Sequence, residues 1–186
     1  MPKVSDEHRD ARRRQIMEGA RRAFGRHGYA AATVGVLEGE VGLSRGAIFS
    51  YFPSKLDLFV ALAQEDRRRL LERWLDGGFE EVLRHLVQDD PDWIGVYLDV
   101  SRMLRMDPQL RERWESMNPE LEEALEQRYA ELQARGEIRG DLPLETIGRF
   151  LGLVFDGIAV QQGARFGPPV DLDGTLELLR SALAPK

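Results

Sequence analysis

A short segment of the chain combines a cation, small residues and hydroxyl groups in a pattern that suits contact with nucleic acid. Residues 45–52 read RGAIFSYF, and Ile48 and Phe52 lie four residues apart on an inward face. The other informative positions are cationic, small or hydroxylated: Arg45, Gly46, Ala47, Ser50 and Tyr51. Arginine can pair bidentately with guanine, small residues permit close approach to a groove, and hydroxyls reach phosphates. The same composition also fits a solvated surface helix, so composition alone permits both interpretations.

Three hydroxyl side chains predict the starts of the helices around this segment. They are Thr33 before residues 34–41, Ser44 before residues 45–52, and Ser54 before a helix that begins at Lys55. Each hydroxyl can accept a hydrogen bond from an orphan N–H in the first turn of its helix. Gly42 supplies a tight turn between the first two segments. Two short helices joined by such a turn are typical of a helix-turn-helix.

This interpretation assigns individual roles on double-stranded DNA. We expect Arg45 to contact a base edge, because its planar fork matches the acceptors of guanine. Phosphate contacts are expected from four side chains at or near helix starts: Thr33, Ser44, Tyr51 and Lys55. Gly46, Ala47 and Ser50 complete the predicted face, because small side chains let the backbone approach the groove.

The segment also resembles a known family signature. Residues 42–52 read GLSRGAIFSYF and are followed by Ser54, Lys55 and Leu58, a pattern similar to that of TetR-family transcriptional regulators. Upstream, Phe24, Gly28 and Tyr29 occupy family positions as well. The chain departs from the pattern at Phe49, where the family usually has Tyr, and at Glu38 and Val41, where it usually has Ala.

The resemblance implies a function and an assembly. It implies a homodimeric repressor that binds a palindromic operator and responds to a small-molecule effector. It also implies that residues 144–160 and the last helix form a four-helix dimer interface. Two other functions are considered, namely a DNA-binding regulator without an effector and an α-helical enzyme or carrier.

Composition and charge agree with an intracellular DNA-binding protein. The 186 residues contain no Cys, which excludes a disulfide framework and a Cys nucleophile. The net charge is −6, but residues 1–55 hold ten Lys and Arg against six Asp and Glu. A basic end on an acidic body indicates which end meets DNA. No secretory signal or membrane-spanning run is found, so we expect a cytoplasmic protein without a membrane partner.

Hydrophobic periodicity predicts an all-α fold of eight to ten helices without a sheet. We expect an N-terminal three-helix helix-turn-helix head, residues 1–54, joined to a helical ligand-binding and dimerisation body, residues 55–186. The helix of residues 55–75 is expected to link them. Asp89, Asp90 and Asp92 are interpreted as an N-cap cluster rather than a metal site. No catalytic motif, resident metal site or cofactor is predicted.

The body carries candidate ligand-binding residues on its apolar helix faces. Leu121, Leu125, Arg128 and Leu132 share one stripe, so Arg128 is expected at a core position. The other candidates lie on two further helices: Trp93, Tyr97, Arg102, Arg105 and Asp156. A buried guanidinium needs an acidic partner or an anionic ligand. Convergence of the three arginines would therefore create a site for a small carboxylate.

The sequence permits two other interpretations of these arginines. Arg128 could pair with Asp99 or Asp156, or the arginines could lay their stems on the core with their charged heads in water. The body segments also resemble the aconitase-repressor-like branch of the TetR family. That resemblance implies a di- or tricarboxylate effector, with or without a divalent ion.

Overall fold

The computed structural model describes residues 6–88, 91–116 and 119–186, and within these ranges all regular secondary structure is helical. The helices are α1 (Asp6–Ala31), α2 (Val34–Val41), α3 (Arg45–Phe49), α4 (Lys55–Gln88), α5 (Pro91–Met106), α6 (Pro108–Glu115), α7 (Pro119–Ala134), α8 (Leu144–Ala164) and α9 (Leu172–Leu183). The predicted all-α class is confirmed. No helix in the described ranges is both long and apolar enough to cross a bilayer.

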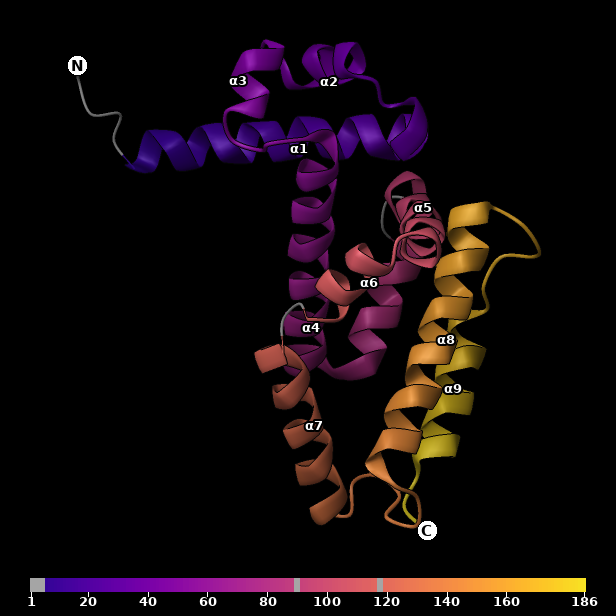
Figure 1. Ribbon diagram of the computed structural model, residues 1–186. Helices are drawn as coiled ribbons and strands as arrows, with labels where there is room; N and C mark the ends of the chain where they lie inside the picture. Colours follow the sequence, from indigo (N-terminus) through magenta and orange to yellow (C-terminus); the bar gives the residue numbers. More distant parts are fainter. Residues whose placement is uncertain (1–5, 89–90, 117–118) are drawn as a thin grey trace.

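Three helices form a head at one end of the molecule. In Figure 1, α2 and α3 lie on the side of α1 that faces away from the body. Gly28 interrupts α1 with φ 71° and ψ 165°, a conformation that glycine adopts without strain, and one further helical turn follows it. α3 ends at Phe49, three residues before the predicted end. Pro53 disfavours a helical conformation for the residue before it, and the chain tightens through a hydrogen bond from Tyr51 N–H to the Ile48 carbonyl of 3.1 Å.

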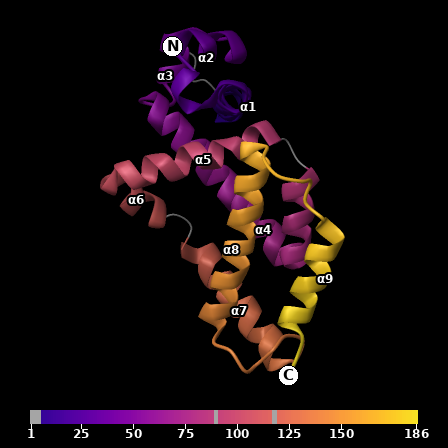
Figure 2. The same ribbon diagram turned by 90° about the vertical axis from the view of Figure 1, so that its right-hand side faces the viewer.

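The long helix α4 descends from the head into the body. Its axis breaks at Gly78, which has φ 72° and ψ −174° and lies just beyond the predicted end at residue 75. Figure 1 shows α7 near the lower part of α4, and Figure 2 shows α8 and α9 as separate helices that run down the body; both of them contact α4. The predicted cluster of Asp89 and Asp90 lies outside the described residues, as does the side chain of Asp92.

Two hydrophobic cores hold this arrangement together. The first joins head residues such as Phe24 and Ile48 to Phe59 of α4 and to Val96 and Val100 of α5. The second joins the lower part of α4 and the start of α5 to α8 and α9, and its fully buried members include Leu83, Leu151 and Leu176. Because α4 and α5 contribute to both cores, either helix can transmit a displacement of the body to the head.

Candidate DNA-binding face and ligand cavity

Side chains predicted as caps fix the geometry of the turn between α2 and α3. The Thr33 Oγ1 accepts a hydrogen bond from Val36 N–H, and the Ser44 Oγ accepts one from Ala47 N–H, both at 3.4 Å. Gly42 adopts the left-handed conformation with φ 73° and ψ 27°. The Ser54 Oγ accepts from Asp57 N–H at 3.1 Å and starts α4 in the same way. These caps confirm the helix starts that the sequence predicted.

Glu38 supplies a further cap that the sequence analysis missed. Its Oε1 accepts a hydrogen bond of 2.6 Å from Arg45 N–H, the first backbone donor of α3. A carboxylate at a helix N-terminus is stabilised by the hydrogen bond and by the helix dipole. Glu38, which stands where the family usually has Ala, therefore has a structural role here, because its carboxylate links α2 to α3.

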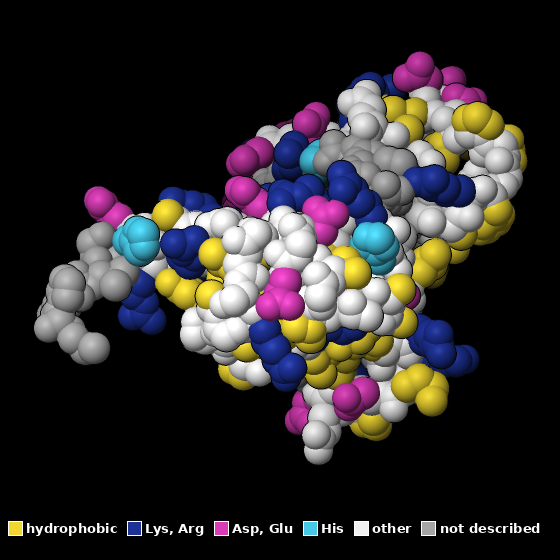
Figure 3. All heavy atoms as spheres, turned by 90° about the horizontal axis from the view of Figure 1, so that it is seen from above, with side chains coloured by type: hydrophobic (Ala, Val, Ile, Leu, Met, Phe, Trp, Pro, Cys, Tyr) yellow, Lys and Arg dark blue, Asp and Glu magenta, His cyan; other side chains and the backbone are white. Residues whose placement is uncertain are grey.

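The face of the head that carries α3 is accessible and consists mostly of small or polar residues. The side chains of Ser44, Arg45, Gly46, Ser50 and Thr33 are exposed, whereas Ala47 and Tyr51 are half-buried. Figure 3 shows backbone and side chains that are neither hydrophobic nor charged over much of this end, with Lys and Arg side chains and a few Asp and Glu side chains among them. Within the described part of the chain, the Arg45 guanidinium takes part in no hydrogen bond or ion pair. It is therefore available to an external acceptor.

Two hydroxyls on this face are partly engaged by the protein itself. The Ser50 Oγ donates to the Ala47 carbonyl at 2.8 Å. Tyr51 packs against the first core with part of its ring. The Oγ atoms of Thr33 and Ser44 can still accept from their capped N–H groups while their own hydrogens remain for an outside acceptor.

Lys55, which was expected to contact a phosphate, is engaged by the protein itself. The Lys55 Nζ donates to the Tyr29 carbonyl at 2.6 Å and to the Ala32 carbonyl at 3.1 Å, with a longer bond of 3.5 Å to Ala30. It also lies 4.4 Å from the centre of the Tyr29 ring. The ammonium therefore satisfies the carbonyls at the C-terminal end of α1. Burial lowers the pKa of Lys55, while its carbonyl partners favour the charged form.

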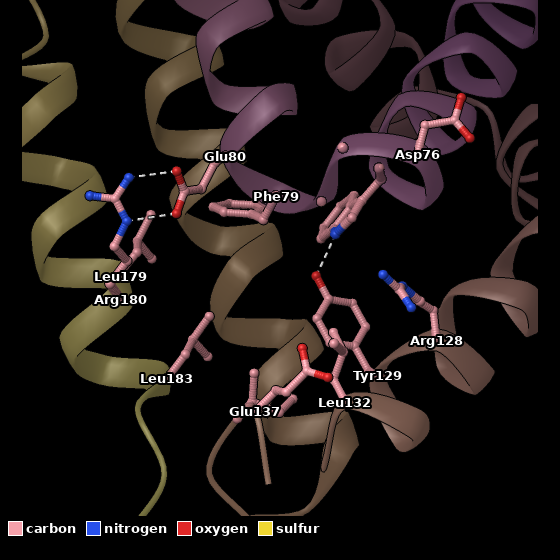
Figure 4. A pocket seen from close by; sticks show the side chains of 14 residues that line it. Asp76, Phe79, Glu80, Arg128, Tyr129, Leu132, Glu137, Leu179, Arg180 and Leu183 are labelled. Atoms are coloured by element: carbon pink, nitrogen blue, oxygen red, sulfur yellow. Dashed lines mark hydrogen bonds and ion pairs between the residues drawn. The ribbon is translucent and has the colours of Figure 1, made fainter. Parts of the chain in front are cut away.

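The body contains a cavity of about 470 Å³ bounded by α4, α7 and α9. Figure 4 shows Arg128 and Tyr129 of α7 facing this cavity, which Gly78 of α4 also lines. The Trp74 Nε1 donates a hydrogen bond to the Tyr129 Oη. Because that oxygen already accepts the indole N–H, the phenol hydrogen can be donated to a ligand. Burial raises the pKa of Tyr129 far above neutrality, so the phenol stays protonated.

Charges around the cavity are unequally paired. Arg180 and Glu80 form a bidentate pair with distances of 2.7 and 2.6 Å, and Glu137 pairs with Arg135 at 2.6 Å. The Arg128 guanidinium has only a loose ion pair of 3.9 Å with Glu131, beyond hydrogen-bond distance. Arg128 is therefore the cation on this wall with the most unused donor capacity.

A second cavity of about 560 Å³ lies between α4, α7 and α8. Trp74 and Tyr129 line both cavities, so this hydrogen-bonded pair stands between them. Neither residue was predicted from the sequence. The sequence does hold a signal for them: Trp and Tyr in an otherwise apolar stripe carry a polar atom. That atom needs a hydrogen-bond partner when the ring is buried.

Several predicted ligand residues do not meet. Arg128 is not in a solid core, since 42% of its side chain is exposed, and its ion partner is Glu131 rather than Asp99 or Asp156. Arg102, Arg105 and Asp156 are exposed and line neither cavity.

The predicted convergence of the three arginines is therefore wrong, because α5 packs on α1 and α8 while Arg128 projects from α7. The side chains of Trp93 and Tyr97 lie outside the described part of the structure. Asp99, the suggested partner, instead accepts a hydrogen bond from Tyr29 N–H. Although Asp156 on α8 is exposed at the surface, partial desolvation by the surrounding protein raises the pKa of its carboxyl. Within the described residues, no cluster of His, Cys, Asp or Glu has the geometry to hold a metal ion.

Comparison with known families identifies both halves of this architecture. Residues 16–62 match the model of bacterial regulatory proteins of the tetR family, and residues 71–185 match the C-terminal domain of BetI-type transcriptional repressors. A curated relative from Corynebacterium diphtheriae, the HTH-type transcriptional repressor AcnR, is 38% identical over 185 residues, which cover 98% of this chain and 97% of the relative.

Solved structures share the fold at lower sequence identity. GusR of Salmonella enterica superposes with a TM-score of 0.75 at 22% identity, covering 98% of this chain and 99% of GusR. The regulator CifR, solved with a 26-base-pair operator, gives a TM-score of 0.63 at 24% identity, with 98% and 99% covered. At these identities the likeness establishes the fold alone.

Proposed function

This chain belongs to the TetR family of bacterial transcriptional regulators, and we propose that it represses transcription by binding a palindromic operator as a homodimer under the control of a small anionic effector. The observation that carries the DNA-binding part is the capped α2–turn–α3 unit, which presents a free Arg45 beside small residues on an exposed face. The names of its repressor relatives support the direction of regulation.

Residues 1–54 are proposed as the DNA-binding unit and residues 55–186 as the unit for effector binding and dimerisation. Arg45 reads a base edge, while Thr33, Ser44 and Tyr51 contact phosphates. Gly46, Ala47 and Ser50 allow close approach of α3 to the major groove. Lys55 is proposed to support the head from within, because its ammonium is occupied by backbone carbonyls of α1.

The outer face of α8 and α9 is proposed as the dimer interface. Large apolar side chains gather there although they are exposed in the single chain: Phe150 at 41%, Leu153 at 66%, Val160 at 40% and Leu178 at 74%. Exposed patches of this kind mark association surfaces. A two-fold dimer formed through this face would present two α3 helices to successive turns of DNA, about 34–36 Å apart.

The effector is proposed to be a small di- or tricarboxylate that binds in the cavity beside Arg128. A carboxylate there can accept two hydrogen bonds from the guanidinium and one from the Tyr129 hydroxyl. Asp76 also lines this cavity, so the ligand must lie toward α7, where Arg128 and Tyr129 are adjacent. A cavity of this size favours an effector-responsive regulator over one that acts by occupancy alone.

Selection of bound sequences from random double-stranded DNA tests this function directly. The wild-type protein is expected to enrich an inverted repeat, and Arg45→Ala, run in parallel, is expected to enrich a degenerate form of it. Light scattering of the complex is expected to give protein in multiples of two. Failure of the wild-type protein to retain any sequence at low salt would refute the proposal, because phosphate contacts alone support binding there.

A further inference from the structure

One residue of the head, Tyr29, is held from two sides by residues that belong to other helices. The N–H of Tyr29 donates a 2.6 Å hydrogen bond to the Oδ2 of Asp99 on α5. The carbonyl of Tyr29 accepts a 2.6 Å bond from the Lys55 ammonium at the start of α4. Hydrogen bonds to charged groups are stronger than those between neutral groups. The end of α1 is therefore fastened to both helices that enter the body.

The backbone at this point is built for the contact. Gly28 has φ 71°, a conformation that side chains disfavour, and a Cβ at this position would lie 3.2 Å from the Asp99 Oδ2. Glycine thus satisfies the turn and leaves room for the carboxylate. The Tyr29 ring is fixed as well, at 4.7 Å from the Phe59 ring and 5.9 Å from the Phe24 ring.

The two hydrogen bonds of Tyr29 lie directly before α2 and α3 in the chain. Ala32 is fully buried, and the next residue, Thr33, caps α2. Glu38 of α2 in turn holds the first N–H of α3. A displacement of the Tyr29 backbone would therefore be carried along a short, hydrogen-bonded chain segment to Arg45.

On the body side, Asp99 belongs to a helix that contacts the proposed dimer helix at backbone distance. A Cβ added to Gly163 of α8 would lie 3.0 Å from the Gly95 Cα and 3.0 Å from the Ile94 carbonyl. Ile94 belongs to the second core, whereas Val96 and Val100, on either side of Asp99, belong to the first. The two helices meet here through their backbones, with no side chain between them that could adjust. A shift of α8 must therefore displace α5.

We propose that Asp99 is a positioning residue for operator binding, whose carboxylate fixes the orientation of the head relative to the body. The inference rests on the proposed function, and it adds the contact that sets the distance between the two heads of a dimer. Asp99 and Lys55 bind the N–H and the carbonyl of the same residue, so a displacement of α5 against α4 makes the head turn or lose a bond. Asp99 does not touch DNA, and it determines half-site spacing without determining base preference.

The test measures affinity for a series of operators in which the spacing of the selected half-sites is altered by one and two base pairs. Wild-type protein, Asp99→Ala and Asp99→Asn are compared, and Glu112→Ala, which removes an exposed carboxylate from the neighbouring α6, serves as the control. Circular dichroism gives the folded fraction of each variant. Base preference within one half-site is measured on the same proteins.

The ratio between the best and next-best spacing is expected to fall about tenfold in Asp99→Ala, which corresponds to ~1.4 kcal/mol. Asp99→Asn keeps a neutral acceptor, so a fall of about threefold is expected. Base preference stays unchanged in both, and the control behaves as wild type. A purely structural role lowers the affinity for all spacings equally and leaves the ratio intact, which overturns the proposal.

If Asp99→Ala does not fold, the Asn variant decides, because an unchanged spacing ratio in that variant also overturns the proposal. If the wild-type protein shows no sequence-specific DNA binding, the proposed function is refuted, and with it the role of Asp99.

Discussion

Replacement of Lys55 by Met separates a structural role of the ammonium from a phosphate contact. The substitution keeps an apolar stem of similar length and removes the charge. Two of its three hydrogen bonds, those to the carbonyls of Tyr29 and Ala32, are partly buried, whereas the 3.5 Å bond to Ala30 is exposed and can be replaced by water. With about 1–1.5 kcal/mol for each partly buried bond, Lys55→Met should lower the free energy of unfolding by about 2–3 kcal/mol.

The assay combines thermal unfolding with the salt dependence of operator binding. For a chain of this length the expected loss lowers the Tm by about 5–10 °C. The slope of log K against log salt should stay unchanged, because no phosphate contact is removed. Arg45→Met is the matched control, since that guanidinium is exposed, and it should weaken operator binding while leaving the Tm unchanged. A slope smaller by about 0.9 in Lys55→Met, with an unchanged Tm, would refute the reasoning.

Four further outcomes are expected. Arg45→Ala should reduce discrimination at one base pair by about 1–3 kcal/mol, measured by competition between operator variants, and equal loss on every sequence would contradict its role. Leu153→Arg should give a monomer in light scattering at micromolar concentration. Millimolar di- or tricarboxylate should raise the Tm of the wild type and change its operator affinity, and Arg128→Ala should abolish both responses. Arg180 holds the pKa of Glu80 below its usual value of 4.5, so the stability from this pair is present above that pH and is lost as the pH falls. Glu80→Gln should therefore be about 0.5–1 kcal/mol less stable at pH 7 and equal to wild type near pH 3, as judged by urea unfolding.

Local signals in the sequence were sufficient for the helix starts and the turn. Thr33, Ser44 and Ser54 cap the predicted helices because an N-cap hydrogen bond involves atoms only two or three residues apart. Gly28 and Gly78 break helices for an equally local reason, namely their positive φ. Such features do not depend on how the helices are packed.

The ligand cavity and the role of Lys55 depend on how the helices pack together. Local sequence signals therefore could not predict them. Periodicity placed Arg128 on an apolar stripe, but only the packing of α7 on α4 shows that this stripe meets a cavity. Lys55 is 23 residues from its partner Ala32, and nothing in the local pattern indicates that the two meet. The same limit applies to Asp99 and Tyr29, which are 70 residues apart.

The open surroundings of Gly46 bear on how this regulator could acquire a different operator. A Cβ at this position of α3 would meet no atom within 4 Å, and its backbone is helical without a positive φ. Replacement by almost any residue except Pro would therefore leave the head folded, and Ala would favour the helix by about 0.5–1 kcal/mol. Each such side chain would project beside Arg45 on the proposed DNA-binding face. Position 46 is thus a point of low evolutionary constraint from folding, at which a single substitution can diversify the recognised sequence among descendants of this protein.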